Sequence, residues 1–207
     1  MTNIQALPKK ILVVLLISAV FTGCGKSDKG ADDKEGGETT VGADHTFDVN
    51  LVNKADAADA IEYKGAAPND EARAIYRNRT VSGETEHSIT MLFGKLEEAG
   101  SIYGNFDLDD DDQPFTELGP YHLADGGVLE IRPEGTADLY TSVSGTLTFS
   151  DLKYARPTTA VGAAAYTLKF EGDFDKYTSG TKSDETYHAS GTFVISPEDD
   201  MGTYKTP

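Results

Sequence analysis

The sequence has a single cysteine, no tryptophan, and only 18 lysines and arginines against 35 aspartates and glutamates in 207 residues. One cysteine cannot form a disulfide within the chain, so burial and hydrogen bonding must hold the fold. Without tryptophan, phenylalanine and tyrosine must supply the large aromatic packing. The net charge of −17 is repelled by nucleic-acid phosphates, so the composition predicts a protein that does not bind nucleic acid.

The sequence also lacks an apolar run long enough to cross a membrane comfortably. The longest run covers residues 11–21, about 12 residues against the roughly 18 to 20 that a transmembrane helix needs. It follows Lys9 and Lys10 and ends in small residues, which is the order of a secretory signal peptide. Residues 1–23 are therefore predicted to be a signal peptide.

The only cysteine lies directly after this run, in the stretch Phe21-Thr22-Gly23-Cys24. A small residue followed by cysteine at this place resembles the lipobox of bacterial lipoproteins. The resemblance implies that Cys24 becomes the first residue of the mature protein, with a diacylglyceryl group on its sulfur and usually a third acyl chain on its amine. Two or more acyl chains give stable anchoring, so the implied partner is a lipid bilayer. The alternative is an ordinary secreted protein with a stray cysteine near its cleavage site.

The lipobox resemblance also implies a location in the cell envelope. Gly25 rather than aspartate follows the cysteine. If the cell is Gram-negative, this resembles the default signal that sorts a lipoprotein to the outer membrane. The domain would then face the periplasm or the cell surface. Residues 24–45 are rich in Gly, Asp, Lys, Glu and Thr and cannot bury enough apolar surface to become ordered. They are predicted to be a lipidated flexible linker with a mean reach of about 25 Å.

Residues 46–207 are predicted to form a single β domain, because apolar residues alternate with polar ones between turn signals. In residues 165–174 one face carries Tyr166, Leu168, Phe170, Gly172 and Phe174. The same alternation places Val143 with Leu147 on one face of residues 143–149, and Tyr187 with Phe193 on one face of residues 187–195. Further strands are expected at 46–52, 60–64, 88–94, 101–108 and 127–133. The predicted fold is all-β, an antiparallel β-sandwich or a partly closed barrel.

Two features of this domain need separate interpretation. Residues 69–79 begin with helix-capping Asn69 and Asp70 but alternate like a strand, so a short helix and a strand both remain open. The segments VSGTLTF (143–149) and ASGTFVI (189–195) share a pattern that predicts two equivalent sheet positions. This pattern resembles the closing strands of small all-β bacterial envelope lipoproteins of unknown function.

The densest acidic run covers residues 107–115, DLDDDDQPF. Clustered carboxylates suit Ca²⁺, so Asp107, Asp109 and Asp111 are candidate metal ligands. The run is not an EF-hand loop, because Asp112 stands where the sharp turn needs glycine and Leu118 where a bidentate glutamate should close the loop. A solvated acidic turn and a weak calcium site are the two interpretations.

No catalytic residues are predicted. The four histidines are scattered, and no zinc, phosphate-loop, dinucleotide or nucleophile-elbow motif occurs in the sequence. The sequence therefore predicts a membrane-anchored lipoprotein whose extracytoplasmic β domain is noncatalytic and has a binding or structural role, without a required cofactor. The alternatives are a calcium-binding module and a hydrolase assembled from dispersed Ser, His and Asp.

Overall fold

The computed structural model describes residues 45–68, 71–81, 84–121, 125–156, 161–198 and 201–207. The predicted signal peptide, Cys24 and nearly all of the predicted linker lie outside these residues. The described residues form β-strands, turns and loops, with no α-helix among them. None of them belongs to a helix that is long and apolar enough to cross a membrane.

The described part of the chain contains ten strands, and most of them cover the segments in which apolar and polar residues alternate. They are β1 (His45–Asn53), β2 (Ala60–Ala67), β3 (Ala72–Val81), β4 (Glu84–Phe93), β5 (Ser101–Asp107), β6 (Glu117–Leu118), β7 (Gly127–Arg132), β8 (Asp138–Ala155), β9 (Val161–Thr178) and β10 (Thr181–Ile195).

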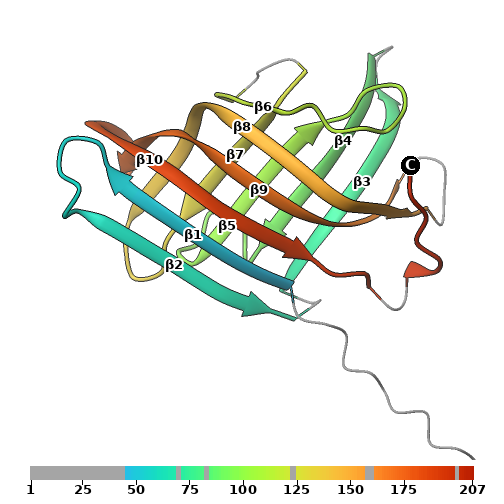
Figure 1. The fold of residues 1–207 in the computed structure, drawn as a ribbon, viewed down its shortest axis with the longest axis horizontal. Helices are drawn as coiled ribbons and strands as arrows, with labels where there is room; N and C mark the ends of the chain where they lie inside the picture. Colours follow the sequence, from blue (N-terminus) through green and yellow to red (C-terminus); the bar gives the residue numbers. More distant parts are fainter. Residues whose placement is uncertain (1–44, 69–70, 82–83, 122–124, 157–160, 199–200) are drawn as a thin grey trace, which may run out of the picture. The chain divides into compact units, whose positions relative to one another are not determined.

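The strands form one sheet in the order β2-β1-β10-β9-β3-β4-β5-β7-β6-β8, and β8 also pairs with β9 and β7. These pairings close a circuit through β9, β3, β4, β5, β7 and β8, while β10, β1 and β2 continue outward from β9. In Figure 1 the strands β2, β1 and β10 lie side by side in front of the layer that contains β3, β4 and β5. All pairings are antiparallel except the short contact of β6 with β7. The predicted all-β fold is confirmed, as one large sheet that is only partly closed.

The alternation predicted for β9 and β10 is observed. On β9 the side chains of Tyr166, Leu168 and Phe174 are buried, and on β10 those of Tyr187 and Phe193 are. The two strands run for 18 and 15 residues, and β8 also has 18, so these three strands are much longer than the short strands expected from sequence. The turn at Ser179 and Gly180, both with positive φ, joins β9 to β10 as a hairpin.

A helix and a strand both remained open for residues 69–79, and from Ala72 onward this segment belongs to strand β3 (Ala72–Val81). The small residues Ala72 and Ala74 and the ring of Tyr76 point into the core, while Arg73 is exposed. A helix would turn these side chains around its axis, whereas a strand buries every second residue. Tertiary burial therefore decides in favour of the strand over the helix-favouring composition.

One predicted core residue is wrong. Val143 was expected to share the inner face of β8 with Leu147, but it is 38% exposed while Leu147 is buried. The cause is a β-bulge between Ser142 and Ser144, where the register of β8 against β9 shifts. A bulge adds one residue to a strand and reverses the faces on one side of it. The buried inward position falls to Ser142, whose hydroxyl donates to the Gly119 carbonyl (2.6 Å) and accepts from the Leu129 N–H (3.0 Å).

The two similar segments at 143–149 and 189–195 lie on opposite sides of β9, as their shared pattern predicts. Gly145 of β8 pairs with Gly172, and Gly191 of β10 pairs with Phe170. At Gly145, whose φ is +151°, a Cβ would overlap the Glu171 carbonyl group. Glycine is therefore required here so that the two backbones can approach closely.

Phenylalanine and tyrosine fill the core in place of tryptophan. Rings of Phe47, Phe93, Phe193 and Phe170 follow one another at centroid distances of 5.3, 5.9 and 5.3 Å. They come from β1, β4, β10 and β9, so the series joins the two layers. Burying one such side chain stabilises the fold by roughly 1.5–3 kcal/mol, which makes this aromatic series a main reason that the layers stay together.

Candidate functional site

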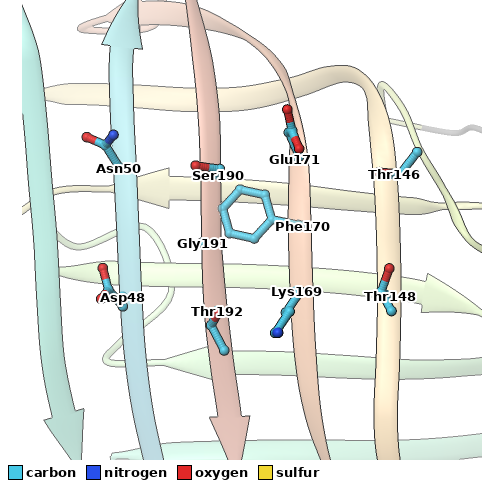
Figure 2. A pocket seen from close by; sticks show the side chains of 10 residues that line it. All are labelled: Asp48, Asn50, Thr146, Thr148, Lys169, Phe170, Glu171, Ser190, Gly191 and Thr192. Carbon is cyan, nitrogen blue, oxygen red and sulfur yellow. The ribbon is translucent and has the colours of Figure 1, made fainter.

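The outer face of the long strands carries a shallow polar groove, shown in Figure 2. Strand register builds it from two cross-strand rows of residues, one on each side of a central row that faces the core. The first polar row is Asp48, Thr192, Lys169 and Thr148, and the second is Asn50, Ser190, Glu171 and Thr146. Because side chains alternate between faces, both rows point outward from β1, β10, β9 and β8.

The floor of the groove is the sheet between the two polar rows, where Gly191 and Phe170 line it. Gly191 lies in the central row beside Phe170, and the ring of Phe170 reaches toward it in Figure 2. The ring is stacked on Phe193 at an interplanar angle of 8°. The resulting hollow has a volume of about 460 Å³. A glycine covered by a neighbouring aromatic ring is a common way to keep such a sheet position packed.

Hydrogen-bonding groups of both kinds surround the groove. Two carboxylates lie at its edges: Asp48 is 3.4 Å from the Lys64 ammonium, and Glu171 is 3.3 Å from Nε2 of His188. Lys169 is the cation among the residues that line it. Four hydroxyls and the amide of Asn50 complete the lining. Such a surface suits an uncharged polar ligand or partner, because it offers both hydrogen-bond donors and hydrogen-bond acceptors.

His188 has carboxylates at both ring nitrogens. Its Nδ1 lies 3.3 Å from Asp173 and its Nε2 lies 3.3 Å from Glu171. Hydrogen bonds from Lys54 (2.8 Å) and His188 hold the pKa of Asp173 below its ordinary value, although burial opposes them. The side chain of His188 points outward and is 45% exposed.

The acidic run at residues 107–115 forms a tight turn that its own hydrogen bonds close. Oδ1 of Asp109 accepts the backbone N–H groups of Asp111 and Gln113, both at 2.9 Å. Asp107 ends β5 and Asp111 is exposed. Within the described ranges, no group of three or more His, Cys, Asp or Glu side chains is arranged to hold a metal ion. The case for Asp107, Asp109 and Asp111 as metal ligands rests on the sequence alone.

Asp112 has a role that the sequence analysis missed. Tyr76 donates its hydroxyl to Oδ1 of Asp112 (2.8 Å), His87 Nε2 lies 2.5 Å from the same oxygen, and Arg156 donates to Oδ2. Although burial disfavours the charged carboxylate, the hydrogen bonds from Arg156 and Tyr76 hold the pKa of Asp112 below its ordinary value. The Arg156 guanidinium also lies 4.3 Å from the ring centre of Tyr76.

These contacts fasten the acidic turn to three strands, because Tyr76 comes from β3, His87 from β4, and Arg156 follows β8. Asp112 has a φ of +62°, a conformation that aspartate tolerates better than most residues. That local preference is visible in the sequence, but the partners come from distant parts of the chain and only the fold brings them together. We refer to Tyr76, His87, Asp112 and Arg156 as the Asp112 cluster.

The tyrosines divide into core and surface positions. Tyr166 and Tyr187, expected in the core, are 2% and 1% exposed, and Tyr140 is also fully buried. Tyr187 donates to Asp59 at 2.6 Å. By contrast, Tyr121 is 53% exposed. Burial raises the pKa of Tyr187, and the hydrogen bond to Asp59 adds to this shift.

Comparison with known protein families, curated proteins and solved structures finds no match for this chain. The account of its function therefore rests on its own residues and geometry.

Proposed function

We propose that this chain is a bacterial lipoprotein, anchored to an envelope membrane by acyl chains on Cys24, with a noncatalytic β domain that binds a partner or ligand outside the cytoplasm. The observation that carries the proposal is the position of Cys24, directly after a short apolar run and a small residue. At about 0.8 kcal/mol per buried CH₂, two or more acyl chains hold a protein on a bilayer stably.

The fold supports this proposal in one respect. The first strand begins at His45, which leaves about 20 residues between the anchor and the sheet. Residues of this composition, treated as a flexible coil, reach about 25 Å on average. That reach exceeds the screening length of about 8 Å at physiological salt, so an acidic domain would stand clear of anionic headgroups.

The groove on the outer sheet face is the binding surface that the geometry favours. It is open, polar and lined by short side chains from four adjacent strands. A sheet face of this kind has little of its own flexibility to lose on binding, so more of the contact energy is available for affinity. Both its carboxylates already face a cationic group or a histidine, which again favours an uncharged partner.

Membrane fractionation tests the anchor. The full chain is produced in its native host as wild type, as Cys24→Ser and as Ser27→Ala, a matched control that leaves the sulfur in place. Wild type and Ser27→Ala should sediment with membranes and resist extraction by high salt. Cys24→Ser should lose this association. Equal membrane association of Cys24→Ser and wild type contradicts the proposal.

A hydrolase is the second candidate, because a histidine, a carboxylate and a serine lie near one another at the groove. His188 contacts Asp173, and Ser190 lies two residues further along the same face of β10, at the groove. A catalytic histidine, however, presents its second nitrogen to the nucleophile, and here that nitrogen faces Glu171. The arrangement fits a surface ion-pair network better than a triad.

Ester hydrolysis separates the two candidates. The full chain is assayed with p-nitrophenyl acetate and p-nitrophenyl butyrate beside Ser190→Ala, His188→Ala and the groove control Thr192→Ala. The noncatalytic proposal expects the same background rate for all four proteins. Activity that disappears in the Ser190 and His188 variants but survives in Thr192→Ala would establish the hydrolase instead.

The calcium-binding alternative rests on the carboxylates of the acidic turn. Calorimetric titration of the full chain with CaCl₂ should then show saturable heat that disappears in the double variant Asp109→Asn, Asp111→Asn. Absence of heat at millimolar Ca²⁺ ends this alternative, because extracellular calcium modules bind in the range of about 10⁻⁴–10⁻³ M.

A further inference from the structure

A small cleft lies beside β5, away from the groove. It has a volume of about 230 Å³, and its lining includes Tyr103, Asn105, Asp107, Pro120, Tyr121 and Val128. Ile102 and Phe106 of the same strand are buried in the core. Strand alternation therefore turns Tyr103, Asn105 and Asp107 outward in one line.

We propose that this cleft binds a single uncharged saccharide ring. A pyranose has an apolar face of C–H groups and an edge of hydroxyls that both donate and accept hydrogen bonds. The cleft offers aromatic walls and polar side chains in a space smaller than the roughly 300–1,000 Å³ of drug-sized pockets. Its size therefore limits the occupant to about one ring.

The aromatic walls are the first part of the argument. Tyr121 is 53% exposed, so part of its side chain is accessible to a ligand. Large aromatic side chains gain by covering an apolar surface while the hydroxyl stays in contact with water. Tyr103, on β5, forms another side of the cleft and is half-buried, and burial together with the neighbouring Tyr121 raises the pKa of its phenol. A hydrogen bond between their hydroxyl groups holds the two tyrosines together.

The orientation of Asn105 is the second part. Arg77 donates to the Thr90 hydroxyl (3.0 Å), and Thr90 donates to Oδ1 of Asn105 (3.1 Å). This series of bonds crosses β3, β4 and β5 and fixes the carbonyl side of the amide. The NH₂ group of Asn105 is then directed away from Thr90 and available as a donor in the cleft. A donor held in place before binding costs less entropy when the ligand arrives.

Charge decides the kind of saccharide. Asp107 is the charged residue among those that line the cleft, in a chain with a net charge of −17. A carboxylated, sulfated or phosphorylated sugar would be repelled. A neutral hexose or N-acetylhexosamine would not be, and its hydroxyls could donate to Asp107 while one accepts from Asn105.

Saturation-transfer NMR with the full chain tests the cleft. The protein is kept in a zwitterionic detergent without a sugar headgroup, and the probes are glucose, galactose, mannose, N-acetylglucosamine and N-acetylgalactosamine. At least one should bind with a dissociation constant of about 1 mM, the range expected for a ligand of about a dozen heavy atoms. Glucuronic acid, the charged counterpart, should bind much more weakly.

Variants locate the binding. Tyr121→Ala should weaken it about tenfold, because an aromatic contact is lost, while Tyr121→Phe keeps the ring and should retain affinity within about threefold. Asn105→Asp replaces the donor with an acceptor and should also weaken binding about tenfold. Tyr177→Ala, a tyrosine of β9 outside the cleft, is the matched control and should bind like wild type.

Two results overturn the inference. In the first, no probe binds the wild-type chain at a probe concentration about 20 times the expected dissociation constant of about 1 mM. In the second, Tyr121→Ala binds the probe as well as wild type does. Tyr121 is exposed, so its variants are expected to fold, and circular dichroism verifies this. The inference does not depend on the lipid anchor. Failure of sugar binding leaves membrane association unchanged, and loss of the anchor in Cys24→Ser leaves the cleft intact.

Discussion

The Asp112 cluster offers the sharpest test of how the acidic turn is held. Changing Asp112 to asparagine keeps the size of the side chain and its tolerance of positive φ, but it replaces one acceptor oxygen with an NH₂ group. Oδ1 accepts from Tyr76 and faces His87, and Oδ2 accepts from Arg156. Either way the amide turns, one of these donors loses its acceptor.

The magnitude follows from burial. A hydrogen bond to a charged group contributes about 1.5–3 kcal/mol, and leaving its partner unpaired adds to the loss. The side chain of Asp112 is 17% exposed but that of Arg156 is 36% exposed, so water partly replaces the lost contact. We expect Asp112→Asn to lower the free energy of unfolding by about 3 kcal/mol. For a chain of this size this corresponds to a fall in Tm of about 6–12 °C.

Urea unfolding of the full chain, followed by circular dichroism and extrapolated linearly, measures this loss. Asp110→Asn is the matched control, because Asp110 lies in the same turn and is exposed, and it should change stability by less than about 0.5 kcal/mol. If both variants lose the same stability, the Asp112 cluster does not hold the turn.

Three further predictions concern stability. Ser142→Ala should lower the free energy of unfolding by about 2–4 kcal/mol, because it leaves the Leu129 N–H and the Gly119 carbonyl unpaired. Ser144 is exposed, so Ser144→Ala should lower it by less than about 0.5 kcal/mol. Hydrogen exchange at the Leu129 amide should become faster only in Ser142→Ala. Gly172→Val should fail to give a cooperatively folded protein in thermal unfolding, because a Cβ there overlaps the Ser144 carbonyl oxygen; a normal transition contradicts this. The pKa of Asp112 is lowered from 3.8 in the folded state, so its stabilisation is fully present above pH 3.8 and is lost as the pH falls through the lower folded value. The stability difference between wild type and Asp112→Asn should therefore shrink as the pH falls below about 4, and a difference that grows over that range refutes the assignment.

The sequence predicts the fold class because period-two alternation is a direct consequence of strand geometry. In β9 and β10 the pattern continues over long stretches, and the buried positions Tyr166 and Tyr187 are assigned correctly. The prediction fails at Val143, since a bulge depends on how Gly145 meets Gly172 on the neighbouring strand, and no pattern within β8 alone reveals that contact.

The candidate sites are less visible from sequence for a related reason. The groove is built by the register of four strands, so its members are scattered through the chain and carry no motif. In the sequence, Asp112 is recognisable only as a residue that is incompatible with an EF-hand loop. Its partners His87 and Arg156 lie far from it in the sequence, so no local pattern indicates these contacts. Tyr121 was not singled out, because its exposure depends on how its loop packs beside β5. Cys24 stands out in the sequence because its resemblance to a lipobox is a local pattern, and its lipidation remains a prediction.

Intact-mass spectrometry of the protein purified from its native host tests the central claim most directly. The proposal predicts a mass that lacks residues 1–23 and includes a diacylglyceryl group on Cys24, with a further acyl chain where the host adds one. A chain that still begins at Met1, or a mature chain whose Cys24 sulfur is unmodified, contradicts the account.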